Sequence, residues 1–332
     1  MCGIVGLHLR NPELVPRLGE LLTGMLCEMA DRGSDSAGVA VYGDPAWSPA
    51  GQGCVSVLDV EPEGGRVTET LGSPVTVCRI GDTYQLSAAA DSENLLAAVR
   101  SVYPDALIAG FGTDLTVLKG VGHPRTLTED WGLAAATGWQ GVGHTRMATE
   151  SAVTPSGAHP YAVGPGQCLV HNGSFANHAT IRRELIAAGA QFDSLNDTEV
   201  GARFVAAQLA AGRDVETALK ELCASFDGFY TLLVSNRDSF AVVRDAIACK
   251  PAVIAETTDW VAMASEYRAL SGLPPHGRGG GRALPKAHVR RPDLLRDSLG
   301  PTARRGSARP ERHHQPHPPR GRPGRRGRRP QT

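Results

Sequence analysis

The sequence predicts a layered α+β fold, and three observations lead to that prediction. The chain has 332 residues with 41% hydrophobic content, which is enough to bury a large core in one domain or two. Its helical patterns are grouped between residues 179 and 224, and strand patterns follow one another from residue 228 to residue 265. Strands grouped with strands, and helices with helices, favour layered packing over alternating βαβ units.

The first element is a short strand that begins beside Cys2. Gly3 and Gly6 flank two β-branched residues, a pattern typical of a buried strand that another backbone approaches closely. A small second residue allows removal of the initiator methionine, which would leave Cys2 with a free α-amine of pKa about 7.7–8.0. A thiol and a base on one residue are what an N-terminal nucleophile requires. The alternative is an ordinary buried thiol in an edge strand.

The next elements are a helix, a charged loop and a long segment with weaker patterns. Leucine and methionine recur at helical spacing from residue 11 to residue 30, which predicts one amphipathic core helix. The loop from Asp31 to Gly38 lies between this helix and a strand, where either function or a structural ion pair is expected. Residues 44–135 contain predicted strands at 55–60, 75–80, 107–112 and 115–120 and a helix at 92–102, and we interpret this segment as an insertion.

Chemically versatile residues stand at the ends of two predicted strands. Arg146 ends one strand, and its planar guanidinium can grip a carboxylate at two points, although single arginines are more often in surface ion pairs. The strand at 168–170 leads into His171-Asn172-Gly173. An amide side chain beside a glycine N–H suits an oxyanion hole, whereas Asn-Gly by itself is more often a plain turn.

Helices and then paired strands follow. Helices are predicted at 179–188, 200–211 and 215–224, with Gly189 placed to end the first. Asn196 or Asp197 is placed to cap the second helix, which is a purely structural explanation for these polar residues. Strand pairs are predicted at 228–234 with 240–245, and at 253–255 with 260–265.

Composition argues against several classes of protein. No apolar run approaches the roughly 18 residues of a membrane helix, and the N-terminus lacks the pattern of a signal peptide. The seven cysteines are scattered without a C-x-x-C pair, which predicts neither a zinc site nor a disulfide framework. We therefore expect a protein of the reducing cytoplasm with no membrane partner.

Taken together, the motifs resemble those of class II glutamine amidotransferases, which carry an N-terminal cysteine and hydrolyse glutamine to glutamate and ammonia. In the order of the family, the motifs are Cys2-Gly3-Ile4, Arg32-Gly33-Ser34-Asp35-Ser36-Ala37-Gly38, His144-Thr145-Arg146, His171-Asn172-Gly173, Asn196-Asp197-Thr198-Glu199, Arg244-Asp245 and Ala264-Ser265-Glu266. The resemblance covers roughly residues 2–270. It implies the N-terminal-nucleophile hydrolase fold, a four-layer αββα sandwich of antiparallel sheets, as one domain over residues 2–272 with an insertion at about 44–135.

The resemblance also implies a role for each matching residue. Cys2 resembles the nucleophile, with its own α-amine as general base, and Asn172 and Gly173 resemble the oxyanion hole. Arg146 is similar to the residue that holds the α-carboxylate of glutamine, and Asp197 to the residue that receives the α-ammonium. These assignments agree with the need of a free amino acid for a cation at one end and an anion at the other. Further substrate-binding residues are predicted on the adjoining loops, namely Thr149, His159 and Arg32.

Two departures from the sugar-phosphate members of the family narrow the resemblance. Met147 stands where those members carry Trp, and Glu150 where they carry His, which argues against a glucosamine-6-phosphate synthase. The insertion and residues 145–151 look closest to stand-alone amidotransferase subunits related to glutamate synthase, such as that of N-methylglutamate synthase. The resemblance implies a hetero-oligomer with glutamate-synthase-like subunits, in which this chain hydrolyses L-glutamine. No cofactor or metal is expected in this chain, whereas the resemblance implies FMN and an iron–sulfur cluster as expected cofactors of a partner synthase subunit.

Other function classes stay open on the sequence alone. One is a catalytically silent regulatory subunit, and another is a self-contained class II amidotransferase of asparagine, purine or amino-sugar synthesis. The intact set of Cys2, Arg146, Asn172, Gly173 and Asp197 argues against the silent subunit. A nucleic-acid binder is not expected, because that hypothesis depends on the C-terminal tail alone.

Residues 273–332 are predicted to form a disordered basic tail. They hold 15 Arg and one Lys against two Asp and one Glu, a net charge of +13, whereas residues 1–272 carry −13. Such a composition lacks the apolar area needed to offset the entropy of ordering it. The preferred explanation is a frameshift in a GC-rich coding region, and the alternative is an arm that binds polyanions.

The nucleotide sequence after the codon for Leu270 decides between these explanations. A frameshift predicts that another reading frame stays open there and encodes an apolar, strand-like continuation. If neither of the other frames does so, the polyanion-binding arm becomes the better explanation, and its salt-dependent affinity for nucleic acid is the measurement to make.

Overall fold

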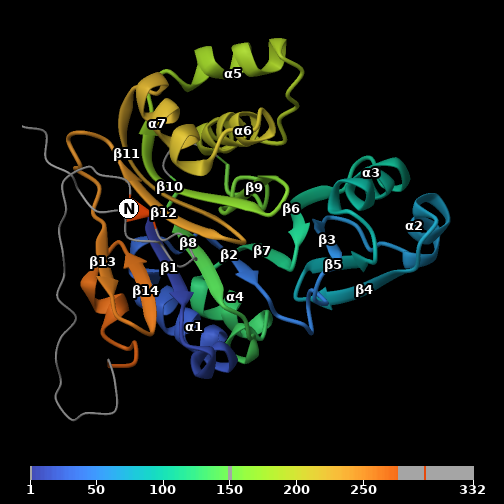
Figure 1. The fold of residues 1–332 in the computed structure, drawn as a ribbon, viewed down its shortest axis with the longest axis horizontal. Helices are drawn as coiled ribbons and strands as arrows, with labels where there is room; N and C mark the ends of the chain where they lie inside the picture. The colour runs from blue at the N-terminus through green and yellow to red at the C-terminus, as the bar shows by residue number, and fades with distance from the viewer. Residues whose placement is uncertain (1, 149–151, 276–294, 297–332) are drawn as a thin grey trace, which may run out of the picture. The chain divides into compact units, whose positions relative to one another are not determined.

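The computed structural model describes residues 2–148, 152–275 and 295–296. Two antiparallel sheets form the centre of the fold (Figure 1). The six-stranded sheet has the order β13 (Val253–Glu256), β14 (Trp260–Ala264), β1 (Gly3–Leu9), β8 (Gln140–Arg146), β2 (Ser36–Tyr42) and β7 (Leu115–Val121). The five-stranded sheet has the order β15 (Leu295–Arg296), β12 (Ser239–Arg244), β11 (Gly228–Asn236), β10 (Gln167–Phe175) and β9 (Tyr161–Gly164).

Strand β1 lies in the middle of the six-stranded sheet and is buried along its whole length. Because side chains alternate along a strand, Val5 and Leu7 face the helical side, while Ile4 belongs to the core between the sheets. Gly6 lies where a Cβ would come within 2.4 Å of Leu233 Cδ2 on the opposing sheet. The glycine therefore lets the two sheets pack closely behind the N-terminus, as its place in the sequence predicts.

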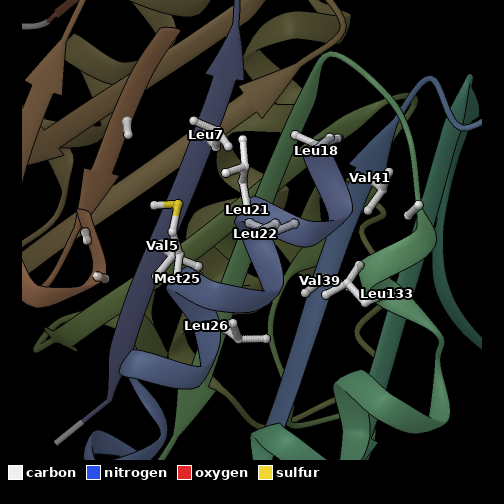
Figure 2. Packing of buried hydrophobic residues seen from close by; sticks show 14 of the residues in the cluster. Val5, Leu7, Leu18, Leu21, Leu22, Met25, Leu26, Val39, Val41 and Leu133 are labelled. Atoms are coloured by element: carbon white, nitrogen blue, oxygen red, sulfur yellow. The ribbon is translucent and has the colours of Figure 1, made fainter. Parts of the chain in front are cut away.

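Helices cover the outer face of each sheet and complete an αββα sandwich. Helix α1 (Leu18–Glu28) packs Leu18, Leu22 and Met25 against β1 and β2, as Figure 2 shows. On the other sheet, one apolar cluster joins strands β10 to β12 to the remaining layer, which contains α5 (His178–Ala187), α6 (Asp197–Ala210) and α7 (Val215–Ser225). The α+β fold class and the four-layer arrangement predicted from the sequence are thus confirmed.

The first predicted helix is shorter than expected. Residues Pro12–Arg17 form a 3-10 helix, η1, and α1 begins only at Leu18. Pro16 lies inside η1, and a proline lacks the N–H that a continuing helix needs. Asn11 caps this short turn by accepting a hydrogen bond from the N–H of Glu13 at 2.9 Å.

A third sheet occupies part of the segment that we interpret as an insertion. It is built from β4 (Val75–Ile80), β5 (Thr83–Ala88), β3 (Gly53–Leu58) and β6 (Leu107–Thr113), and it packs with α2 (Gly64–Leu71) and α3 (Ser92–Val102). Strand β7 then returns to the six-stranded sheet, and α4 (Pro124–Asp130) joins the layer of α1. The third sheet, together with α2 and α3, therefore spans residues 53–113, which is narrower than the segment 44–135 that we interpret as an insertion.

The predicted tail lies for most of its length outside the described residues. Of its described part, Leu273 is buried in the core beside α1, and the carbonyl of Pro274 accepts a hydrogen bond from Trp260 Nε1 at 3.1 Å. The two-residue strand β15 pairs with β12. Among the described residues, no helix has the length and apolar content needed to cross a membrane.

Candidate active site

The site begins where the ends of β1 and β8 meet. The two strands are antiparallel, with Gly3 opposite Thr145, so Cys2 lies beside the C-terminal end of β8. The thiol of Cys2 is 3.7 Å from the carbonyl oxygen of Met147. The same strand end carries Arg146, which is opposite Ser36 of β2. Sheet pairing thus brings the predicted nucleophile and the predicted carboxylate-binding residue to one edge.

The second sheet contributes Asn172 across the interface between the sheets. Asn172 Nδ2 donates a hydrogen bond to the carbonyl oxygen of Cys2 at 3.1 Å, and the residue is only 4% exposed. Asn172 and Gly173 do not form a turn, because β10 runs on to Phe175. The structure therefore brings the predicted oxyanion donor into contact with the predicted nucleophilic residue.

Gly173 is required by the backbone here. Its φ is +138°, and a Cβ would lie 2.0 Å from the carbonyl oxygen of Phe229 on β11. The N–H of Phe175 donates to Asp197, and the N–H of Tyr230, opposite Gly173, donates to Asp245.

Arg146 and Asp197 are held by the backbone of neighbouring loops. Arg146 is 5% exposed, and its NH1 donates to the carbonyl of Ala152 at 3.2 Å. Asp197 is the first residue of α6, whereas Asn196 is the cap, accepting from the N–H of Thr198 at 2.9 Å. One oxygen of Asp197 accepts from the N–H of Phe175 at 2.9 Å, which ties α6 to the end of β10.

The three further predicted residues fall in different places. Arg32 Nε donates to the carbonyl of Cys2 at 2.9 Å, and its NH1 pairs with Glu266 at 2.7 Å, so Arg32 holds the backbone of Cys2. His159 is buried, with Nε2 2.9 Å from the hydroxyl of Thr198. Thr149 lies outside the described residues, as does Glu150.

Sequence reasoning missed a buried histidine cluster beneath the site, formed by His144, His159 and His171. The rings of His144 and His159 stack with centroids 4.0 Å apart. His171 Nδ1 lies 2.9 Å from the hydroxyl of Thr198, the same group that His159 contacts. Burial lowers the pKa of His144 to about 3 and also lowers the pKa values of His159 and His171. The cluster is therefore uncharged at neutral pH.

Ser265 is the other site residue that sequence reasoning did not assign. Its hydroxyl accepts a hydrogen bond from Asn172 Nδ2 at 3.1 Å and another from the N–H of Ile4 at 2.9 Å. Both His144 and Ser265 belong to motifs shared with the family, but the pairing of distant strands that brings them to Asn172 leaves no signal in local sequence.

Comparison with known proteins identifies the family. The chain is 46% identical to the glutamine amidotransferase-like protein GlxB of Rhizobium meliloti over 284 residues, covering 82% of this chain and 92% of GlxB. The chain belongs to the class II glutamine amidotransferases. A family model described as a glutamine amidotransferase domain matches residues 144–272 of this amidotransferase, which is thus an enzyme with the glutamine amidohydrolase activity of its family.

More distant relatives share parts of the amidotransferase. The glutamine–fructose-6-phosphate aminotransferase of Streptomyces coelicolor is 34% identical over 162 residues, which cover 48% of this chain and 26% of that protein. Among solved structures, the glutamine phosphoribosylpyrophosphate amidotransferase of B. subtilis matches with a TM-score of 0.50 and 18% identity, covering 81% of this chain and 43% of that one. This likeness supports the N-terminal-nucleophile hydrolase fold.

No metal centre is formed by the described part of the amidotransferase, where no group of three or more His, Cys, Asp or Glu side chains is arranged to hold an ion. The histidine cluster offers nitrogen atoms alone, and its rings contact Thr198 and one another.

The amidotransferase should lose stability as the pH falls below about 6.5. Each buried histidine has a lower pKa folded than unfolded, so the unfolded chain binds more protons between those two values and is favoured by acid. The expected loss is about 1.4 kcal/mol per pH unit for each such histidine. Urea unfolding midpoints between pH 7.5 and 5.5 measure it.

A comparison of variants isolates the contribution of the cluster. His159→Gln should flatten the pH dependence of stability, because it removes one of the three buried histidines. Equal slopes for the wild type and His159→Gln would contradict the explanation.

Proposed function

We propose that this chain is the glutaminase subunit of a glutamate-synthase-like assembly, with Cys2 as the nucleophile. The observation that carries the proposal is the hydrogen bond from Asn172 Nδ2 to the carbonyl of Cys2, which joins an oxyanion-type donor to an N-terminal thiol residue. Gly173, the next residue of β10, is proposed to supply the second donor through its backbone N–H. An amide substrate beside Cys2 would meet both donors.

The proposed reaction is hydrolysis through a thioester. The α-amine of Cys2 takes the thiol proton, and the sulfur attacks the side-chain carbonyl carbon of glutamine. The carbonyl oxygen becomes an oxyanion, which the Gly173 N–H and Asn172 Nδ2 stabilise. One hydrogen of Asn172 Nδ2 turns from the carbonyl of Cys2 to the oxyanion. Collapse of this intermediate expels ammonia with the proton held by the amine, and water then cleaves the thioester to glutamate and regenerates the thiol.

Arg146 and Asp197 are proposed to bind the amino-acid end of glutamine. Arg146 is buried at the strand end beside Cys2, and Asp197 keeps its side chain 22% exposed at the start of α6. A guanidinium suits the α-carboxylate and a carboxylate suits the α-ammonium. Thr149 and His159 stay predicted as pocket residues, whereas the contacts of Arg32 fit a role in holding Cys2 in place.

Arg146→Ala should raise KM for glutamine on the order of 10²-fold, because the α-carboxylate would then be desolvated without a partner. Asp197→Asn should raise KM less, since an amide oxygen still accepts from the ammonium. Initial rates across glutamine concentrations measure both effects, with Arg100→Ala on the exposed face of α3 as a control. A lower kcat with unchanged KM in Arg146→Ala would contradict the binding role.

A separate acceptor subunit is proposed from the extent of the similarity. The match to GlxB extends over 92% of that protein, whereas the match to the fructose-6-phosphate aminotransferase covers only 26% of it. This supports an amidotransferase that works as its own chain and passes ammonia to a partner. The partner is proposed to carry the FMN and the iron–sulfur cluster of a glutamate-synthase-like enzyme.

A glutaminase assay of the purified full chain tests the proposal. The assay follows glutamate release with and without glutamate-synthase-like subunits from the same source. We expect a basal rate that rises when a partner and its acceptor are added. A catalytically silent regulatory subunit would give no glutamate in either case, and a self-contained amidotransferase would use an acceptor without any partner.

A further inference from the structure

The amide of Asn172 is held on both of its sides. Its Nδ2 donates to the carbonyl of Cys2 and to the hydroxyl of Ser265, both at 3.1 Å. Its Oδ1 lies 3.2 Å from Nε2 of His144. All three partners come from the six-stranded sheet or its ends, so that sheet fixes the orientation of a side chain from the other sheet.

The hydrogen on His144 can be assigned from a second contact. His144 Nε2 also lies 3.1 Å from the carbonyl oxygen of His171, which can only accept a hydrogen bond. Nε2 therefore carries the hydrogen, and the atom of Asn172 that faces it must be the acceptor Oδ1. The donor Nδ2 is then forced to face Cys2, in agreement with the acceptor it meets there.

His144 makes no other hydrogen bond that would explain its presence. Its Nδ1 has no hydrogen-bond partner among the described residues, and the residue is fully buried. Burial keeps the ring neutral across physiological pH, so the donor on Nε2 is always available. The hydrogen bonds of this histidine are thus directed only at Asn172 and at the carbonyl next to it.

We propose that His144 is a positioning residue for glutamine hydrolysis, which holds the Asn172 amide so that Nδ2 faces the reacting carbonyl. Ser265 completes the clamp and ties it to β1, since its hydroxyl also accepts from the N–H of Ile4. The inference rests on the proposed oxyanion role of Asn172. Without the donor on His144, one of the three contacts that fix the amide is lost, and the flipped orientation, which presents Oδ1 and repels an oxyanion, becomes more populated.

Two substitutions of His144 separate the hydrogen bond from the packing. His144→Gln keeps an N–H near the position of Nε2, whereas His144→Leu fills the space without a donor. We expect His144→Leu to lower kcat 10- to 100-fold with KM within about twofold of wild type, less than the 10²- to 10³-fold typical of losing an oxyanion donor outright. We expect His144→Gln to recover most of the rate.

His8 offers a matched control for the loss of a buried histidine. It lies on β1 and its Nδ1 is 3.0 Å from Oε1 of Gln140, the same kind of histidine–amide contact at the opposite end of the β1–β8 pair. His8→Leu should destabilise the fold to a similar extent in thermal unfolding but leave kcat unchanged. An equal fall of kcat in His8→Leu and His144→Leu would overturn the positioning role.

A double-mutant comparison distinguishes this inference from the proposed function. If Asn172→Ala alone leaves kcat unchanged, the oxyanion role fails and the clamp fails with it. If Asn172→Ala lowers kcat, His144→Leu should add little in that background, because it acts through an amide that is gone. Full additivity would overturn the positioning role alone. Should His144→Leu not fold, Ser265→Ala gives the same comparison from the other side of the clamp.

Discussion

Cys2→Ala is expected to lower the rate of glutamine hydrolysis by at least about 10⁴-fold, since the thioester path needs the sulfur and loss of a nucleophile commonly costs roughly 10⁴- to 10⁶-fold. Glutamine binding should survive, because Arg146 and Asp197 are unchanged. Cys2→Ser should keep a small residual rate, as the α-amine base remains while the nucleophile is poorer. The rate of glutamate release at saturating glutamine is to be measured for the wild type, Cys2→Ala and Cys2→Ser.

Two further measurements test whether Met1 is removed and whether the loss of rate is specific to Cys2. Intact-mass measurement should show loss of the initiator methionine. As long as Met1 is attached, the α-amine of Cys2 is part of a peptide bond and cannot act as a base. Cys223→Ala, which removes an exposed thiol on α7, should retain the wild-type rate. Undiminished turnover in Cys2→Ala would exclude Cys2 as the nucleophile, and retention of Met1 in a fully active protein would exclude the α-amine as base.

Asn172→Ala is expected to lower kcat on the order of 10²- to 10³-fold, or about 3–4 kcal/mol of transition-state stabilisation, with little change in KM. The reason is that the donor meets the oxyanion only after the carbonyl has been attacked, whereas it contributes little to binding of the neutral amide. The Gly173 N–H remains, so the loss should be partial.

A second asparagine near the same strand end serves as the control. Asn177 donates to the carbonyl of Ser225 and accepts from the N–H of Asp227, and it has no contact with Cys2. Asn177→Ala should affect stability more than rate. A change confined to KM in Asn172→Ala would remove the oxyanion assignment and leave Asn172 as a binding residue.

The sequence predicts the layers well because they depend on local patterns. The helix at 92–102 and the strand at 75–80 match the structure residue for residue, since alternation and helical spacing are read directly from apolar positions. The leucine pattern predicts a helix longer than α1, because Pro16 keeps the first turns in the 3-10 helix η1 and this effect is not visible in apolar spacing. Strand β5 was missed, since its sequence, Thr83–Ala88, is half polar although nearly all of it is buried.

The site could be predicted only in part, because some of its contacts depend on the pairing of strands that are distant in sequence. Cys2, Asn172 and Arg146 carry reactive or charged groups in motifs that are visible along the chain, and the family is confirmed. Their individual roles stay predictions. His144 and Ser265 act on Asn172 through contacts that depend on the register of β1 with β8 and on the end of β14, which no local pattern specifies.

The pairing of β1 with β14 bears on when the enzyme becomes active during its synthesis. Ile4 and Ser265, which are joined by a hydrogen bond, are separated by 261 residues along the chain. The cost in chain entropy of closing that loop therefore falls late in folding. Removal of Met1 needs only the first residues to emerge from the ribosome. If Cys2 is the nucleophile as proposed, it is unmasked early but assembled late, and a nascent chain should release no ammonia until β14 has been made.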